Sequence, residues 1–264
     1  MPYLELEDGF CLYYERYGDG APVLFAHGAG GNSMSWWQQV PAFMERYTVV
    51  TFDHRAFGRS PDIQNGPGRT AFGPDVVALI TALELGPVHF IAHSMGARTA
   101  MGLMRHNPAW IRSLTVSGSN AGCVDDQLRT RKIELQASGE LQGTLLQRAL
   151  AENFREHNPA LAGLYHRIRS INPSRPRDFL APPPEMRNYR GSTRDRIIES
   201  DIPLLWIVGE LDRVIPAELV MMSHKLTPGS RYLHIPNTGH SAYFENAAAW
   251  NNAVLTFVDK VEAN

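Results

Sequence analysis

Three polar residues whose types together allow nucleophilic catalysis stand in turns of this chain. Each follows a segment apolar enough to be a buried strand, namely 87–91 before Ser94, 203–208 before Asp212 and 231–235 before His240. A serine is a weak nucleophile at neutral pH and needs a base within hydrogen-bond reach, which a third group must orient. The three residues therefore predict attack on an acyl carbon, with Ser94 as nucleophile, His240 as base and Asp212 as the orienting acid.

The residues around Ser94 have the pattern of a nucleophile elbow, a sharp turn from a strand into a helix. Such a turn needs small residues two before and two after the serine, and here they are Ala92 and Gly96. The turn exposes the hydroxyl and points the backbone N–H of the next residue, Met95, toward the same space. Met95 is therefore one predicted donor to the negative charge that develops on the attacked carbonyl oxygen.

The second donor is expected from the glycine-rich run 27–31, which follows the apolar segment 22–26. Glycines on both sides of Ala29 let the backbone approach a ligand closely, so the N–H of Ala29 is the predicted donor. The same loop leaves Gly28 and Gly30 open as alternatives.

Other carboxylates compete with Asp212 for the orienting role, and they are Glu210, Asp201 and Asp195. The chain order Ser94, Asp212, His240 is the one expected for this arrangement. The turn after the preceding strand holds Ser119 and Asn120, which are not acidic, and this favours Asp212.

The elements that must position these residues alternate between strands and helices, which predicts the α/β class with a mainly parallel sheet flanked by helices. Parallel strands end at one edge of a sheet, so residues distant in sequence can meet there. Strands are expected at 4–7, 11–17, 22–26, 47–52, 87–91, 111–117, 203–208 and 231–235, and helices at 35–47, 75–85, 95–106, 216–226 and 242–261.

A segment without clear buried strands interrupts this alternation after the sixth strand. We expect residues 1–119 and 197–264 to form the two parts of the core, and residues 120–196 to form an inserted helical cap. The cap holds 13 Lys/Arg and 9 Asp/Glu, a net charge of +4. Its arginines are most simply a solvated face, but one or two of them are candidates to bind a substrate carboxylate, with Arg187 and Arg190 selected first. The set includes Arg129, Arg167, Arg169, Arg187 and Arg190.

Composition limits the classes of partner. The 264 residues are 44% hydrophobic and 20% charged, with a net charge of −2, which gives no reason to expect nucleic acid or a membrane. No apolar run approaches the length of a membrane span, and no signal peptide is visible. Two isolated cysteines, Cys11 and Cys123, predict neither a disulfide framework nor a metal site, so a cytoplasmic location is expected. The oligomeric state is left open, with a homodimer as one expectation.

The motifs together resemble the α/β-hydrolase superfamily. More narrowly, they are similar to its lid-bearing branch, which contains 3-oxoadipate enol-lactonases, meta-cleavage product hydrolases and related esterases. Ala92 and Ala56 depart from this pattern, since glycine is usual at both places. The motifs that carry the resemblance are His27-Gly28, the run from Asp53 to Ser60, His93 to Gly96, Gly209 to Asp212, and Gly239-His240.

The resemblance implies an α/β-hydrolase fold, a serine nucleophile, a small-molecule substrate, and neither a metal nor an organic cofactor. The leading prediction is a hydrolase of small carboxylic esters or lactones, with a substrate that is anionic or aromatic. Hydrolysis of a C–C bond in a vinylogous diketone is one alternative, and a ligand receptor or signalling protein with little turnover is another. Substrate contacts are expected from His27, Gly28, Trp36, Arg187 and Arg190.

Overall fold

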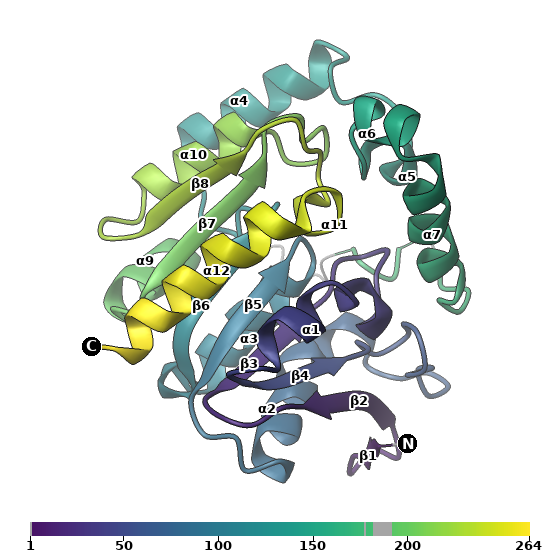
Figure 1. Ribbon diagram of the computed structural model, residues 1–264, viewed down its shortest axis with the longest axis vertical. Coiled ribbons are helices and arrows are strands. Elements are labelled where there is room, and N and C mark those ends of the chain that lie inside the picture. Colours follow the sequence, from purple (N-terminus) through teal and green to yellow (C-terminus); the bar gives the residue numbers. More distant parts are fainter. Residues whose placement is uncertain (1, 177, 182–191) are drawn as a thin grey trace.

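The computed structural model describes residues 2–176, 178–181 and 192–264. Its strands form one eight-stranded sheet in the order β1-β2-β4-β3-β5-β6-β7-β8 (Figure 1). The first two strands are antiparallel to their neighbours, and all pairs from β4 to β8 are parallel. The strands are β1 (Tyr3–Glu5), β2 (Cys11–Tyr17), β3 (Pro22–Ala26), β4 (Thr48–Phe52), β5 (Val88–His93), β6 (Ile111–Ser117), β7 (Leu204–Gly209) and β8 (Arg231–Ile235).

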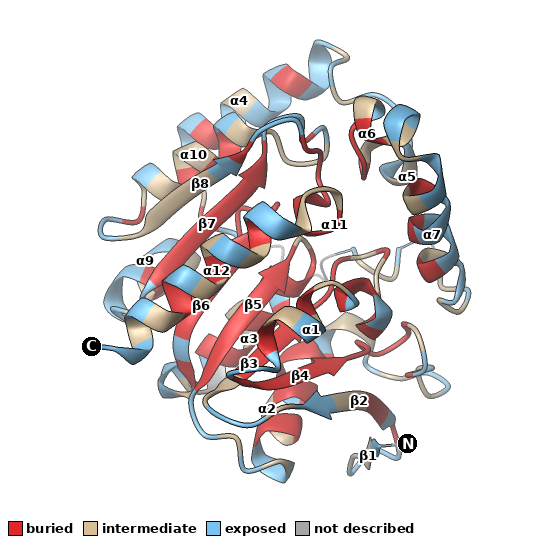
Figure 2. Cartoon of the chain, viewed as in Figure 1, coloured by how far each residue is buried: buried red, intermediate tan, exposed pale blue. Residues whose placement is uncertain are grey.

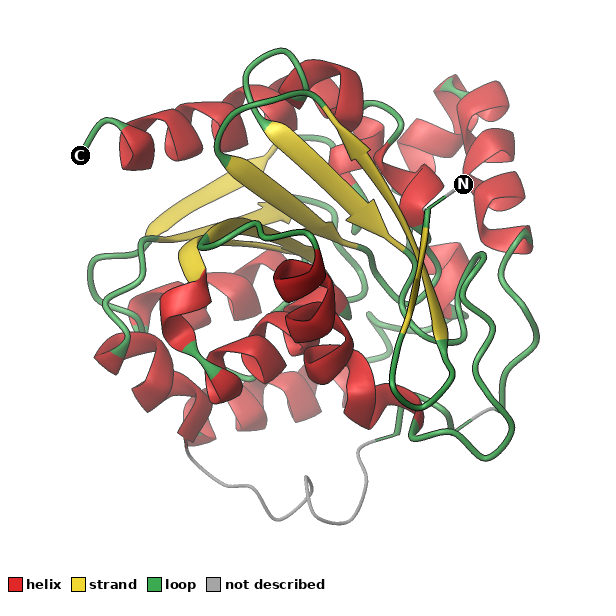
Figure 3. Ribbon diagram, turned by 90° about the horizontal axis from the view of Figure 1, so that it is seen from below, coloured by secondary structure: helices red, strands yellow, loops and turns green. Residues whose placement is uncertain are grey.

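Helices cover both faces of this sheet, as Figure 3 shows. The helices outside the insertion are α1 (Gln39–Phe43), α2 (Phe72–Ala82), α3 (Gly96–His106), α10 (Ala217–Lys225), α11 (Ala242–Glu245) and α12 (Ala247–Glu262). Between β6 and β7 the chain forms α4 (Asp126–Ala137), α5 (Leu145–Arg148), α6 (Glu152–His157), α7 (Pro159–Ser170) and α9 (Ser192–Glu199). This arrangement confirms the predicted fold class, including a helical insertion after the sixth strand.

Strand β3 illustrates how the core is divided between the two faces. Successive side chains of a strand point to opposite faces. Leu24 accordingly packs in the cluster that includes residues of α2, α3 and α10, whereas Phe25 packs in the cluster that includes residues of α1 and α12. The central strands are therefore buried on both sides (Figure 2).

The insertion between β6 and β7 packs on the core through apolar contacts of α4, α6 and α7. Leu128 of α4 packs against Leu219 of α10 in one cluster. Phe154 of α6 and Tyr165 of α7 contact Phe244 of α11, with ring centroids 6.3 and 5.1 Å apart. The cap is thereby attached to the segment that follows His240, while its boundaries at 120 and 196 stay predictions.

Two predicted helices are broken in the structure. The helix expected at 35–47 consists of a 3-10 turn, Ser33–Trp36, and the short α1. Pro41 has no amide hydrogen, so a continuous helix from residue 35 would lose its bond to residue 37. The helix expected at 242–261 is interrupted at Asn246, whose side chain accepts a hydrogen bond from the Ala249 N–H and caps α12.

Across the part of the chain that the structure describes, no helix combines the length and the apolarity needed to cross a bilayer.

Candidate active site

Ser94 occupies a strained turn between β5 and α3. Its φ is +50°, in the left-handed region that non-glycine residues seldom adopt. The Ser94 N–H donates to the Ser117 carbonyl of β6 (2.8 Å), which fixes the turn to the neighbouring strand. Only glycine fits two residues later, because a Cβ on Gly96 would stand 2.3 Å from the Ala26 carbonyl oxygen. The local sequence thus forms the turn that exposes the hydroxyl.

The structure brings Ser94, His240 and Asp212 into one chain of hydrogen bonds. His240 Nδ1 lies 2.8 Å from Asp212 Oδ2, and His240 Nε2 lies 3.0 Å from Ser94 Oγ. A carboxylate can only accept, so Nδ1 carries the proton and Nε2 accepts from the serine hydroxyl. The imidazole is thereby oriented to receive the hydroxyl proton.

The remaining oxygen of Asp212 is held by backbone donors. Its Oδ1 accepts from the N–H groups of Val214 (2.7 Å) and Ile215 (2.9 Å). The competing Glu210 is exposed and accepts instead from the Asn237 N–H (2.9 Å). Among the candidate acids, it is Asp212 that the structure places against the imidazole.

The two predicted oxyanion donors lie close to the serine. Ala29 and Met95 pack in one apolar cluster, so the loop 27–31 and the start of α3 are neighbours. Gly28 also lies close to the serine, since a Cβ there would stand 3.2 Å from Cβ of Ser94. This close approach leaves no room for a side chain at position 28, while the predicted substrate contact of Gly28 stays a prediction.

His27 stabilises the conformation of the loop 27–31 through the hydrogen bonds of its ring. Its Nε2 accepts from the His54 N–H (2.9 Å), so its Nδ1 carries a proton and donates to the Gly28 carbonyl (2.8 Å). Burial lowers the pKa of His27 to about 3, so the ring is neutral. Both of its nitrogens are used by backbone, and the structure gives it a supporting position in place of the predicted substrate contact.

His93 is an uncharged ring that packs beside the predicted base, His240. Its ring centroid lies 4.8 Å from that of His240 and 4.8 Å from that of Tyr243. Burial lowers the pKa of His93 well below its ordinary value, and the nearby His240 lowers it further. A neutral neighbour leaves His240 free to take up charge without repulsion from a second imidazolium.

The prediction for Trp36 is wrong in the structure. Its side chain is fully buried, and its ring packs against Phe25 (5.0 Å between centroids), Tyr243 (4.8 Å) and Trp250 (6.1 Å). It is a core residue between the sheet and α12. Arg187 and Arg190 lie outside the described residues.

Glu245 is a carboxyl near the site that the sequence analysis missed. Its Oε2 accepts from the N–H of Gly239 (2.9 Å) and from that of Ala151 in the cap (3.1 Å). Burial raises the pKa of Glu245 to about 7 despite these donors. No spacing in the sequence indicated it, because its burial depends on the packing of the cap.

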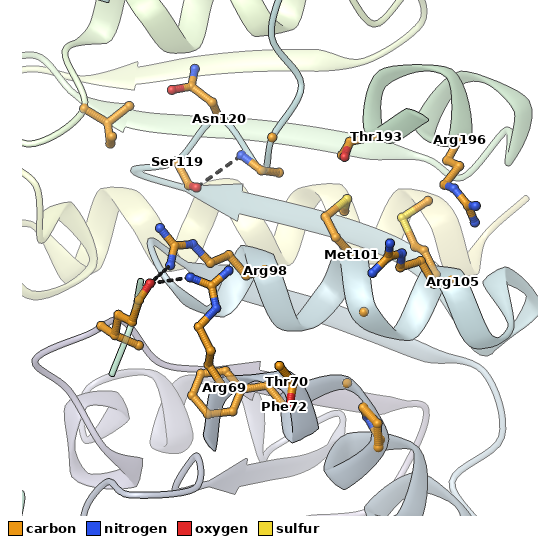
Figure 4. A pocket seen from close by; sticks show the side chains of 18 residues that line it. Arg69, Thr70, Phe72, Arg98, Met101, Arg105, Ser119, Asn120, Thr193 and Arg196 are labelled. Atoms are coloured by element: carbon orange, nitrogen blue, oxygen red, sulfur yellow. Dashed lines mark hydrogen bonds between the residues drawn. The ribbon is translucent and has the colours of Figure 1, made fainter. Parts of the chain in front are cut away.

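A cavity of about 450 Å³ lies beside the segment 119–122 and residues of α2 and α3 (Figure 4), and Ser94, Asp212 and His240 are not among the described residues that line it. Its lining includes Ile215, which donates to Asp212, and Ser119, which follows Gly118. A Cβ on Gly118 would stand 3.1 Å from the His240 ring, so the segment that contributes Ser119 to the lining also contacts the predicted base. The cavity has the size of a site for a small organic molecule.

One wall of this cavity is positively charged. Arg69 and Arg98 point toward one another in Figure 4 and both donate to the carbonyl oxygen of Leu180, Arg98 at 3.1 Å. Burial, together with the nearby charge of Arg98, lowers the pKa of Arg69 to about 10. Arg105 and Arg196 add to the same lining.

Comparison with known proteins agrees with the fold. The model of the alpha/beta hydrolase fold family matches residues 21–247. BpoC of Mycobacterium tuberculosis, whose name assigns it to the non-heme bromoperoxidases, is 31% identical over 96% of this chain and 99% of its own. The 3-oxoadipate enol-lactonase 1 of Acinetobacter baylyi is 28% identical over 74% of this chain and 73% of its own. A solved thermophilic esterase from Thermogutta terrifontis has a TM-score of 0.79 at 22% identity and covers 98% of both chains, a likeness of fold.

Proposed function

This chain belongs to the alpha/beta hydrolase family, and on that premise we propose that it hydrolyses small carboxylic esters or lactones through an acyl-enzyme. The hydrogen-bonded chain from Asp212 through His240 to Ser94 carries the proposal. Relatives named as an esterase and an enol-lactonase support the same reaction class.

In the proposed acylation step, Ser94 Oγ attacks the acyl carbon and its proton passes to His240 Nε2. Asp212 stabilises the imidazolium that forms. The N–H groups of Ala29 and Met95 donate to the negative oxygen of the tetrahedral intermediate. The intermediate collapses when the leaving oxygen takes the proton from His240 and departs, which leaves the acyl group on Ser94.

Deacylation repeats these steps with water as the nucleophile. His240 removes a proton from water as the oxygen attacks the acyl carbon, and then returns the proton to Ser94 Oγ. The products are the free carboxylic acid and the regenerated serine. In a lactone both products belong to one opened hydroxy acid. In the proposal, the cap excludes bulk water from the intermediates.

A substrate panel combined with active-site labelling tests this proposal. A p-nitrophenyl ester chain-length series, a set of lactones and a vinylogous diketone are compared at equal enzyme concentration, and a fluorophosphonate probe is mapped by mass spectrometry. We expect turnover of short esters or lactones and a label on Ser94 alone. Cleavage of the diketone alone would replace the proposal with C–C bond hydrolysis. If a ligand raised the melting temperature of the protein but was never consumed, and Ser94 carried no label, the proposed hydrolysis would be replaced by a role as a ligand receptor.

A second candidate is favoured by the full-length relative named as a non-heme bromoperoxidase. Hydrogen peroxide would attack the acyl-enzyme in place of water and release a peracid, which oxidises bromide to hypobromous acid and returns to the carboxylic acid. The test is bromination of a phenol dye in acetate buffer with peroxide and bromide. Bromination that is lost in Ser94→Ala supports this candidate, and bromination no faster than the enzyme-free reaction removes it.

A further inference from the structure

The side chain of Arg169, at the end of α7 in the cap, reaches the loop 27–31 that supplies a proposed oxyanion donor. A Cβ built on Gly30 would stand 1.5 Å from Arg169 Nη1 and 2.2 Å from its Cζ. The guanidinium therefore occupies the place that a side chain at position 30 would fill. Its carbon also lies 5.8 Å from the centroid of the Tyr165 ring. The loop and this arginine fit one another only because residue 30 is glycine.

Residues on both sides of Arg169 are hydrogen-bonded to the segment 30–32. The side chain of Asn32 donates to the Ile168 carbonyl (2.8 Å), one residue before Arg169. The side chain of Asn172, three residues after Arg169, donates to the Gly30 carbonyl (3.0 Å). Two hydrogen bonds thus hold the end of α7, which carries Arg169, against this segment.

A second guanidinium makes this loop a region of positive charge. Arg175 donates to the carbonyls of Ala56 (2.9 Å) and Ala29 (3.4 Å), and stacks on the Phe57 ring. Burial lowers the pKa of Arg175, and the charge of Arg169 lowers it further, so the two cations lie within electrostatic reach. No ion pair joins either arginine to a carboxylate within the residues that the structure describes.

We propose that Arg169 binds a carboxylate of the substrate, so that the natural substrate is an ester or lactone that carries a separate carboxylate. A guanidinium presents a planar pair of donors that matches a carboxylate with two parallel hydrogen bonds. The guanidinium of Arg169 borders Gly30, the residue after the proposed oxyanion donor Ala29, and a substrate that carries both groups would place its carboxylate on Arg169 when its acyl carbon is at Ser94. This inference rests on the proposed hydrolysis at Ser94.

A matched pair of esters tests the inference. The p-nitrophenyl ester of valeric acid and the p-nitrophenyl monoester of glutaric acid have the same chain length and differ in a terminal methyl or carboxylate. For Arg169→Gln we expect KM for the glutarate ester to rise by about tenfold or more. The values of kcat and KM for the valerate ester should stay within about threefold of wild type. Arg169→Lys keeps the charge without the paired donors and should lie between the two.

The cap offers a matched control. Arg167 lies on the same last turn of α7 and is exposed, so Arg167→Gln should leave both esters unaffected. If Arg169→Gln lowered kcat/KM equally for both esters, Arg169 would only stabilise the loop 27–31, and the inference would be overturned. A rise in KM for the glutarate ester alone in Arg98→Gln, with no rise in Arg169→Gln, would also overturn the inference. It would place the substrate carboxylate at Arg69 and Arg98.

Failure of the proposed hydrolysis is distinguishable from failure of this site. If wild-type protein hydrolyses neither ester, calorimetric titration with glutarate compares wild type with Arg169→Gln. Binding by wild type that weakens by about tenfold in Arg169→Gln supports the carboxylate site without catalysis. Equal affinity for both proteins, or no binding by wild type, contradicts it.

Discussion

Glu245 and Gly239 are joined by a hydrogen bond in which a buried carboxylate holds the backbone of the residue before His240. The same carboxylate oxygen accepts from Ala151, so one side chain connects the loop of the proposed base with the cap. A change in the ionisation of Glu245 therefore acts on both.

The first prediction concerns the stability of Glu245→Gln as a function of pH. The pKa of Glu245 is raised from 4.5 to about 7, so between these values the folded protein retains a proton that the unfolded chain has released. Wild type therefore loses stability as the pH rises through this window, and the loss is complete above it. Glutamine keeps an acceptor and does not ionise. The melting temperature of the variant relative to wild type should increase by a few degrees from about pH 5 to about pH 8. A difference that stays constant across this range would contradict the prediction.

Replacement of the proposed nucleophile should abolish turnover and spare the fold. Ser94→Ala removes the attacking oxygen and keeps the small side chain, so we expect kcat to fall by about 10⁴-fold or more. The measurement is steady-state hydrolysis of the best ester, with circular dichroism and thermal unfolding as controls for folding. Turnover near that of wild type would show that another group attacks the acyl carbon.

The orienting acid can be identified by comparing variants of Asp212 and Glu210, two carboxylates that stand two positions apart. Asp212→Asn leaves the shape of the side chain but favours the wrong imidazole tautomer, and should lower kcat by about 10³–10⁴-fold. Glu210→Gln keeps an acceptor for the Asn237 N–H and should leave kcat within about threefold of wild type. The reverse order of losses would reassign the acid.

Gly30→Ala tests the place of Arg169 from the opposite side of the contact. The added methyl meets the far end of a flexible side chain, so we expect the protein to fold with the guanidinium displaced. KM for the glutarate ester should then rise by about threefold or more, with KM for the valerate ester unchanged. Gly163→Ala is the matched control, because a Cβ there meets nothing within 4 Å and helix propensity should raise stability slightly. Equal KM changes for both esters in Gly30→Ala would contradict the prediction.

The fold and the grouping of Ser94, Asp212 and His240 could be predicted because their signals are local. Apolar segments followed by glycine-containing turns indicate strand ends, and strand ends of a parallel sheet meet at one edge. The role of Glu245 could not be predicted, because its burial depends on the contact between α11 and the cap. These are segments far apart in sequence, and no periodicity connects them.

The arginines of the cap show where sequence reasoning ends. Arg167 and Arg169 have the same chemistry and stand two residues apart on one helix. Residues two apart face different directions on a helix, so only the packing of α7 decides which one reaches the loop. Trp36 fails for a related reason, since an aromatic side chain near a predicted site suits a pocket and a core equally well.

Strand β6 pairs directly with β7, although the whole cap is inserted between them in the chain. The pairing of these two strands is therefore made without residues of the cap, and it brings the turns that carry Ser94 and Asp212 to one edge of the sheet. A cap of another shape would leave this strand pairing intact, but it would change the contacts that the cap makes with Glu245 and with the loop 27–31.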